Sequence, residues 1–151
     1  MANENVVRPP ERLRQLVSWQ ASKMSTVGAR LTARRMPLGA RGDFAVLAAL
    51  DEYGPLSQAE LGRRLGLDRN DVNGIVGRLQ ASGHIDRQAD PTDRRRNVVT
   101  ATDPGLEQLE QLQRYADAVQ EELLDTLTDD EQQTLRDLLA KVLSGHGPQS
   151  A

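Results

Sequence analysis

Residues 57–83 constrain the fold most strongly, because they contain two short helix patterns separated by a tight turn. The segment reads SQAELGRRLGLDRNDVNGIVGRLQASG. Ser57, followed three residues later by Glu60, forms a capping box, which predicts that a helix begins there. Gly66 is expected to end that helix, and Asp68 to cap the next one by accepting hydrogen bonds from its first turn. The pattern therefore predicts a helix-turn-helix.

A two-stranded β-hairpin is predicted immediately after this segment. The sequence HIDRQADPTDRRRNVVTA has alternating residues on both sides of a stretch rich in turn formers. Three consecutive arginines, Arg94, Arg95 and Arg96, lie at the predicted tip. Because the hairpin follows the helix-turn-helix within a few residues, the sequence predicts a winged helix-turn-helix.

Two helices are expected before this central unit. Apolar residues recur at three- and four-residue steps from about residue 10 to residue 34, which predicts one long first helix. A second helix is expected to start near Gly39 and to end at Gly54. Its interior is strongly apolar, so we expect it at the centre of the fold.

Two more helices are expected after the hairpin. Thr102 or Asp103 opens the first, whose apolar residues form a heptad seam over 109–123. The second begins at Thr128, with Glu131 completing another capping box. The predicted fold class is thus mainly α, a winged helix-turn-helix with a small two-stranded β-wing and N- and C-terminal dimerisation helices.

The expected organisation is one compact domain with three functional regions. Residues 1–37 form an N-terminal dimerisation helix, residues 38–102 the winged helix-turn-helix DNA-binding region, and residues 103–151 the C-terminal dimerisation helices. The apolar stripes on the outer helices exceed what a small winged domain can cover, which favours a second copy of the chain as the partner. An intramolecular helical bundle is the alternative.

Composition limits the class of protein. The chain has 151 residues, of which 38% are hydrophobic, and contains no apolar run long enough for a membrane span. No signal peptide is evident, so the cytoplasm is the expected compartment. The absence of cysteine excludes disulfides and thiolate chemistry. His84 and His146 have no partner at ligand spacing, and no nucleophile elbow or phosphate-binding loop occurs, so we expect no enzyme, cofactor or metal site.

Charge is distributed unevenly along the chain. The formal net charge is −3, but residues 60–102 carry eight basic against six acidic side chains, and residues 103–151 carry three against eleven. The overall value therefore conceals a basic middle segment. Such an asymmetry predicts that one end of the fold meets an anionic partner.

The second helix of the helix-turn-helix, about residues 68–81, is the expected reader of DNA, because such helices enter the major groove. Arginine can pair bidentately with guanine and asparagine with adenine, and both residue types occur in its exposed first turns. A glycine on the outward face lets the backbone approach DNA closely, with simple tolerance of a poor helix former as the alternative. The candidate DNA-binding residues on this helix are Arg69, Asn70, Asn73, Gly74 and Arg78.

The wing arginines, Arg94, Arg95 and Arg96, are expected to reach phosphates and the adjacent minor groove, whose narrow stretches attract arginine. Arg95 is the arginine that we expect to insert into the minor groove. Asp93 is interpreted as a brace that pairs with a neighbouring arginine and fixes the loop. A solvated turn is the alternative for the whole run. Further candidates for phosphate contacts are Arg63, Arg64 and Arg87.

The hairpin resembles the wing signature of the MarR family of winged helix-turn-helix transcriptional regulators, in which an Asp-Arg-Arg run precedes a strand and a Leu-Thr-x-x-Gly helix start. The segment LSQAELGRRLGLDRNDVNGIVGRLQASGHIDR resembles the central region of that family. With the helix order, the resemblance covers nearly the entire chain. It departs from the family pattern at Ala101, where leucine is usual, and at Gly74, where a longer polar or basic residue is common. The matching wing residues are Asp90, Pro91, Asp93, Arg94, Arg95, Thr102 and Gly105.

The resemblance implies a homodimer, formed by the first and last helices, that binds a pseudo-palindromic site on double-stranded DNA. We predict that it is a repressor, with a winged-helix module used only for protein contacts as the alternative. The resemblance also implies a small-molecule effector bound between the dimer helices and the DNA-binding region. Trp19 and Phe44 are the aromatic candidates for that pocket, although core packing is the commoner role of both. We expect either a weakly binding aromatic acid or no physiological ligand.

Overall fold

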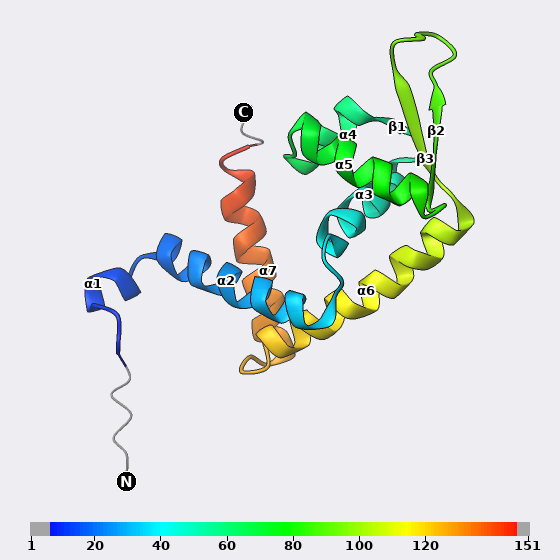
Figure 1. Cartoon of the computed structure of the whole chain (residues 1–151). Helices are drawn as coiled ribbons and strands as arrows, with labels where there is room; N and C mark the ends of the chain where they lie inside the picture. Colours follow the sequence, from blue (N-terminus) through cyan, green and yellow to red (C-terminus); the bar gives the residue numbers. More distant parts are fainter. Residues whose placement is uncertain (1–6, 148–151) are drawn as a thin grey trace.

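A computed structural model describes residues 7–147 and has a central winged unit from which the first and last helices extend (Figure 1). It confirms the mainly helical winged helix-turn-helix fold. The elements are α1 (Glu11–Arg14), α2 (Val17–Arg35), α3 (Ala40–Tyr53), β1 (Leu56–Ser57), α4 (Gln58–Leu65), α5 (Arg69–Ala81), β2 (Ile85–Ala89), β3 (Asn97–Ala101), α6 (Asp103–Leu123) and α7 (Asp129–Ser144).

Helix α3 lies at the centre, as its apolar composition predicts, and packs against α4, α5, α6 and β3. The side chains of Val46 and Leu47 in α3 are fully buried, as are those of Leu61 in α4, Val76 in α5 and Val99 in β3. Each element thus contributes a large apolar side chain to one core. Burial of such a side chain stabilises a fold by about 1.5–3 kcal/mol, so this core fixes the positions of the helix-turn-helix and the wing.

The predicted caps of the helix-turn-helix are confirmed. The Ser57 hydroxyl accepts a hydrogen bond from the Glu60 backbone N–H, and the Glu60 carboxylate accepts one from the Ser57 N–H. Gly66 has a φ of 64°, which is the left-handed conformation that ends α4. The Asp68 carboxylate accepts a hydrogen bond from the Asp71 N–H, at 2.8 Å, and so caps α5. The turn is therefore set by side chains that lie within it.

The sheet has three strands rather than the two predicted. The order is β1–β3–β2, with β3 antiparallel to both neighbours. The strand that sequence analysis missed, β1, has only two residues, Leu56 and Ser57, which pair with Val99 and Val98. Two residues cannot show the alternation by which a strand is recognised. The short strand attaches the start of α4 to the middle strand of the wing.

The prediction of one long first helix is wrong at its N-terminal end. Helix α1 ends after Arg14, and Leu16 is extended, with φ −83° and ψ 118°, before α2 begins. The side-chain amide of Gln20 donates a hydrogen bond of 2.7 Å to the Arg14 carbonyl, which is one of the groups left free at the end of α1. This bond stabilises the break, because the freed backbone acceptor still has a donor.

The wing is joined to α6 by a close backbone contact. The hydroxyl of Thr102 accepts a hydrogen bond from the Gly105 N–H and donates one to the Gly83 carbonyl, while the Thr102 N–H donates to the His84 carbonyl at 3.1 Å. Gly105 is buried, and a Cβ on it would overlap the His84 carbonyl oxygen. Glycine is therefore required where α6 starts.

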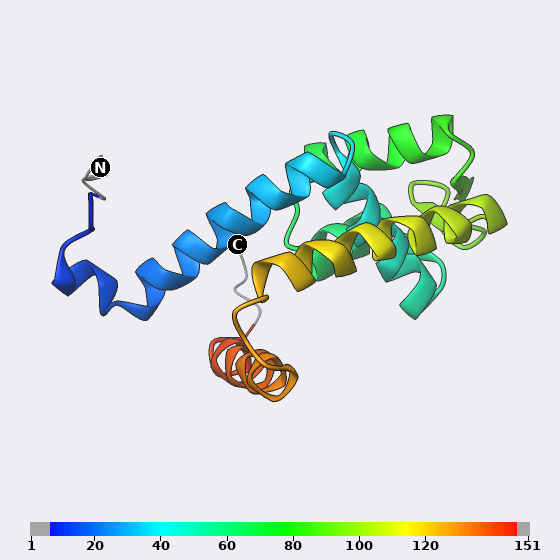
Figure 2. The same ribbon diagram turned by 90° about the horizontal axis from the view of Figure 1, so that it is seen from below.

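Much of the heptad seam on α6 packs within the chain. Leu109 and Leu112 belong to the central core, and Val119 is 3% exposed. Helix α2 packs along the second half of the same helix. The last helix differs, because no residue of α7 is buried, and it lies apart from the winged unit (Figure 2).

Candidate nucleic-acid interface

The outward side of α5 carries the residues predicted to read DNA. Arg69, Asn70 and Asn73 are exposed in its first turns. The opposite side of the helix is buried in the core. Gly74 is exposed, and a Cβ there would meet no atom within 4 Å, so the backbone is open to approach. The side-chain carbonyl of Asn73 accepts a hydrogen bond of 3.3 Å from the amide of Gln58, which leaves the Asn73 NH₂ group directed elsewhere.

Arg78, another predicted DNA-binding residue, is exposed and forms an ion pair with α3. Its Nη2 lies 2.5 Å from Asp43 Oδ1 and 3.4 Å from the Gly39 carbonyl oxygen. The two side chains of this ion pair are 46% and 19% exposed, respectively. Since 35 residues separate them in the sequence, no local pattern could have predicted the pair.

The wing turn is fixed by short-range hydrogen bonds. The Asp90 carboxylate accepts hydrogen bonds from the backbone and hydroxyl of Thr92, and these bonds lower the pKa of Asp90 below its usual value. The Asp93 carboxylate accepts a hydrogen bond of 2.9 Å from the Arg95 backbone N–H. Asp93 was expected to pair with an arginine side chain, whereas this bond is to the backbone. The Arg95 guanidinium is exposed beyond it.

The three wing arginines differ in their surroundings. All three are exposed, but Arg96 also reaches back to the start of α4. Its Nη2 lies 3.3 Å from the Ser57 hydroxyl and 3.8 Å from the Glu60 carboxylate. The pKa of Glu60 is lowered, mainly by hydrogen bonds from the Ser57 backbone and hydroxyl, with a smaller effect of Arg96. Arg96 therefore connects the wing to the helix-turn-helix, a role that the arginine run does not reveal.

A cleft of about 590 Å³ separates the helix-turn-helix from the wing. Of the described residues that line it, none is acidic. The Nε of Arg87 is buried and has no hydrogen-bond partner among the described residues. Concentrated positive charge in a concave site attracts anions more strongly than the same charges on a flat surface. We call this site the arginine cleft, after Arg63, Arg69, Arg87, Arg95 and Arg96.

Arg64, another predicted phosphate contact, lies outside the arginine cleft. Its guanidinium carbon is 4.0 Å from the centre of the Tyr53 ring, which is the geometry of a cation–π contact. The ring belongs to the end of α3, so the exposed Arg64 side chain connects α4 to α3 at the surface. The sequence did not indicate this partner.

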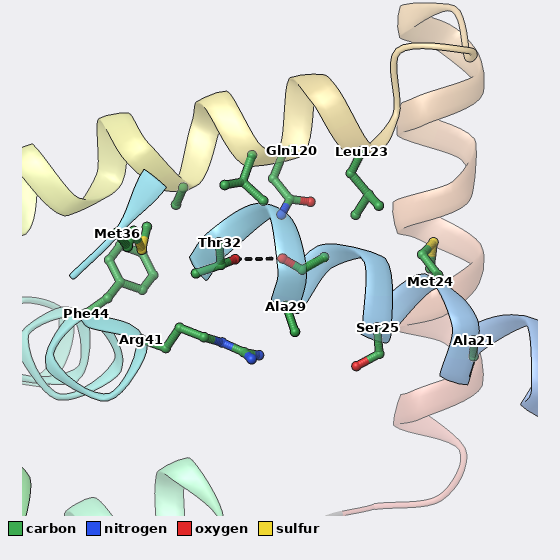
Figure 3. Close-up of a pocket in the computed structure, with 13 residues that line it drawn as sticks. Ala21, Met24, Ser25, Ala29, Thr32, Met36, Arg41, Phe44, Gln120 and Leu123 are labelled. Carbon is green, nitrogen blue, oxygen red and sulfur yellow. Dashed lines mark hydrogen bonds between the residues drawn. The ribbon is translucent and has the colours of Figure 1, made fainter. Parts of the chain in front are cut away.

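A second cavity, of about 350 Å³, lies between α2, α3 and α6 (Figure 3). Phe44 lines it, as predicted, together with Met36 and the guanidinium-bearing Arg41. Trp19, the other aromatic candidate, is not among the residues that line this cavity. It lies near the start of α2, where the Lys23 ammonium is 5.4 Å from the centre of its ring. Periodicity places Trp19 on the helix but does not say how far along α2 the cavity extends.

Within residues 7–147, no three His, Cys, Asp or Glu side chains lie close enough together to hold a metal ion. No helix in that part of the chain has both the length and the apolar character needed to cross a bilayer.

The order of α3, α4, α5 and the wing defines a winged helix-turn-helix protein, and an arginine cleft lies beside the exposed turns of α5. The MarR family model matches residues 39–96. The multiple antibiotic resistance protein MarR of Salmonella typhimurium is 35% identical over 101 residues, which cover 66% of this chain and 70% of that protein. The chain belongs to the MarR family.

Two further similarities bear on function. The HTH-type transcriptional repressor NicR of Pseudomonas putida is 34% identical over 100 residues, which span 66% of this chain and 63% of NicR, less than two thirds of that relative. A crystal structure of a mutant MarR from E. coli complexed with operator DNA superimposes with a TM-score of 0.70 at 26% identity. It covers 83% of this chain and 92% of the MarR chain.

Proposed function

We propose that this chain is a sequence-specific, DNA-binding transcriptional repressor. The observation that carries the proposal is the arginine cleft, which lies between α4, α5 and the wing and has no acidic lining residue among those described. Phosphate contacts supply most of the affinity of a protein for DNA, so a cleft of this kind suits the duplex backbone. The relative complexed with operator DNA and the relative named as a repressor support this assignment.

In this proposal the two exposed elements have separate roles. Arg69, Asn70 and Asn73 read base edges in the major groove from the first turns of α5, and Gly74 lets the helix approach closely. Arg95 enters the adjacent minor groove from the wing turn, which Asp93 holds through the backbone. Arg63 and Arg87 bind phosphates in the arginine cleft.

We further propose that the active form is a homodimer. In α7, the apolar side chains of Leu138, Val142 and Leu143 are 57%, 58% and 70% exposed, and those of Leu16 and Val17 near the start of α2 are 50% and 70% exposed. Burying such a surface against a second copy removes apolar area from water. A two-fold dimer presents its two reading helices to an inverted repeat. The dimerisation regions proposed at 1–37 and 103–151 include residues 1–6 and 148–151, which lie outside the described part.

We also propose that a small molecule bound in the cavity between α2, α3 and α6 lowers DNA affinity. The lining is largely apolar, with Met24, Phe44 and Leu123, and Arg41 is its one cationic lining residue among those described. An aromatic carboxylic acid matches this lining. Its ring would replace water against the apolar side chains, and its carboxylate would pair with the Arg41 guanidinium.

The test is selection of fragmented DNA from the source genome by the purified protein, at about 150 mM salt to suppress non-specific binding, followed by sequencing. A retained inverted repeat, with half-sites about one helical turn apart, is the expected result. Enrichment that does not exceed that of random fragments would contradict the proposal and favour a winged-helix module for protein contacts. Reporter expression from the retained site, with and without the protein, distinguishes repression from activation.

A further inference from the structure

The first turn of α3 faces the DNA-reading helix on one side and the effector cavity on the other. Asp43 and Gly42 contact α5. Arg41 and Phe44, on the same turn, line the cavity (Figure 3). Because an α-helix turns by 100° per residue, positions so close in sequence alternate between the two sides. The first turn of α3 therefore contacts α5 on one side and lines the cavity on the other.

The side toward α5 is packed closely enough to transmit a displacement. A Cβ built on Gly42 would lie 2.8 Å from Ile75 Cδ1, and one on Gly39 would lie 2.9 Å from Arg78 Nη2, so the ends of two α5 side chains lie directly against these glycines. Arg78 then closes the contact through its ion pair with Asp43. We call this set, Gly39, Gly42 and Asp43 against Ile75 and Arg78, the α3–α5 contact.

The side toward the cavity carries the groups that an occupant would meet. Phe44 and Met36 give the apolar wall, and the Arg41 side chain extends from α3 toward α2 (Figure 3). Met36 belongs to the segment between α2 and α3, whose Gly39 has a φ of 85° and precedes the helix. A molecule seated there bears directly on the start of α3.

From this geometry we infer that the α3–α5 contact transmits occupancy of the cavity to the DNA-reading helix, with Arg78 as a positioning residue that does not itself contact DNA. The inference rests on the proposed function. Packed cores repack between discrete arrangements more readily than they deform continuously, so a displaced first turn of α3 moves Ile75 and Arg78 with it. The ion pair with Asp43 is what makes α5 follow.

The first test replaces Asp43 with alanine. Removing a negative charge from a DNA-binding protein ordinarily raises its affinity for DNA. The inference predicts the opposite, a loss of about fivefold in affinity for the selected operator with an unchanged salt slope, because α5 is no longer held in position. Asp51→Ala, an exposed acidic residue of the same helix, is the matched control and should not weaken binding. If Asp43→Ala binds as tightly as the unmodified protein or more tightly, the inference is overturned.

A second variant covers the case in which Asp43→Ala fails to fold. Asp43→Asn keeps a side-chain oxygen as a hydrogen-bond acceptor but removes the charge. Folding is checked for each variant by thermal unfolding at one protein concentration. Weakened operator binding by folded Asp43→Asn supports the inference, and unchanged binding overturns it.

The cavity can be filled without knowing the natural effector, because the sequence contains no cysteine. Ser25 lines the cavity, so Ser25→Cys provides a single thiol there. Benzyl methanethiosulfonate forms a mixed disulfide with that thiolate and releases methanesulfinate, which leaves a benzyl group in the cavity. Ser22→Cys, exposed on the same helix and outside the lining, is the labelling control.

The expected result is that the benzyl group on Ser25→Cys lowers operator affinity about fivefold or more, and less than about twofold when Asp43→Asn is also present. Equal losses in both backgrounds would overturn the inference.

Amide hydrogen exchange supplies a readout that does not involve DNA. The label should increase exchange in α5 when Asp43 is present but not in Asp43→Asn. Absence of that difference overturns the inference, whereas failure of the genomic selection refutes the proposed function and leaves this readout intact.

Discussion

Replacement of Gly105 by alanine should destabilise the protein strongly, although alanine is the better helix former. A Cβ at this position overlaps the His84 carbonyl oxygen and lies 2.9 Å from the carbonyl carbon and 3.2 Å from Cα. All three are backbone atoms, so no side-chain rotation relieves the overlap. Restoring an ordinary carbon–carbon separation of about 3.5 Å requires the start of α6 to move away from the wing.

The magnitude follows from what that movement disturbs. Overpacking of this kind costs about 1–3 kcal/mol. Displacement also weakens the cap from Thr102 to Gly105 and the hydrogen bond from Thr102 to His84, each contributing about 1 kcal/mol. The higher helix propensity of alanine returns up to about 1 kcal/mol. The expected loss is therefore about 2–4 kcal/mol in the free energy of unfolding.

Urea unfolding at a fixed protein concentration measures this loss, since the midpoint of the proposed homodimer would depend on concentration. Gly77→Ala is the matched control, because the same substitution there meets no atom within 4 Å and lies inside α5. It should stabilise the protein by up to about 1 kcal/mol. If Gly105→Ala is as stable as the unmodified protein, the contact between the wing and α6 is not as rigid as the geometry indicates, and the reasoning is refuted.

Three further predictions follow from the interface. Arg95→Ala should weaken operator binding and lower the salt slope of binding by about one. Arg96→Ala should weaken binding with a smaller change in that slope, because the Arg96 guanidinium faces Ser57. Equal slopes for the two variants in salt-dependent binding titrations would contradict this prediction. Asn73→Ala should relax base preference at one position of each half-site, and an equal loss on operator and random DNA would exclude it as a reader. Because the pKa of Glu60 is lowered in the folded protein, its ionised carboxylate stabilises the fold at pH values above 4.5, its pKa in the unfolded chain, and this stabilisation is lost as the pH falls through the folded pKa. Glu60→Gln should therefore reduce the fall of the urea midpoint between pH 7 and pH 3. An unchanged fall would contradict this prediction.

The sequence predicted the features that depend on neighbouring residues. The capping boxes at Ser57 and Thr128, the glycine end of α4 and the order of helices are confirmed, because each is set within a few residues of the chain. The break at Leu16 and the two-residue strand β1 were missed. Neither leaves a periodic signal, since one is a single extended residue and the other is too short to alternate.

The candidate site was predictable by residue type but not by partner. A run of arginines looks uniform in the sequence, yet the Arg96 side chain bonds to Ser57, 39 residues away, whereas Arg95 is held through its backbone N–H by Asp93. Arg78 has the spacing of a residue on the surface of α5, but its partner Asp43 lies on another helix. Such pairings form only when the core brings distant segments together, so their assignment requires the three-dimensional structure.

Ser57 takes part in three sets of interactions. Its backbone is part of β1, its hydroxyl and N–H complete the cap of α4, and the same hydroxyl accepts the hydrogen bond from Arg96. We expect local unfolding of the wing to be coupled to that of the first helix of the helix-turn-helix, because both elements use Ser57, and the amides of α4 and β3 should then open with similar free energies.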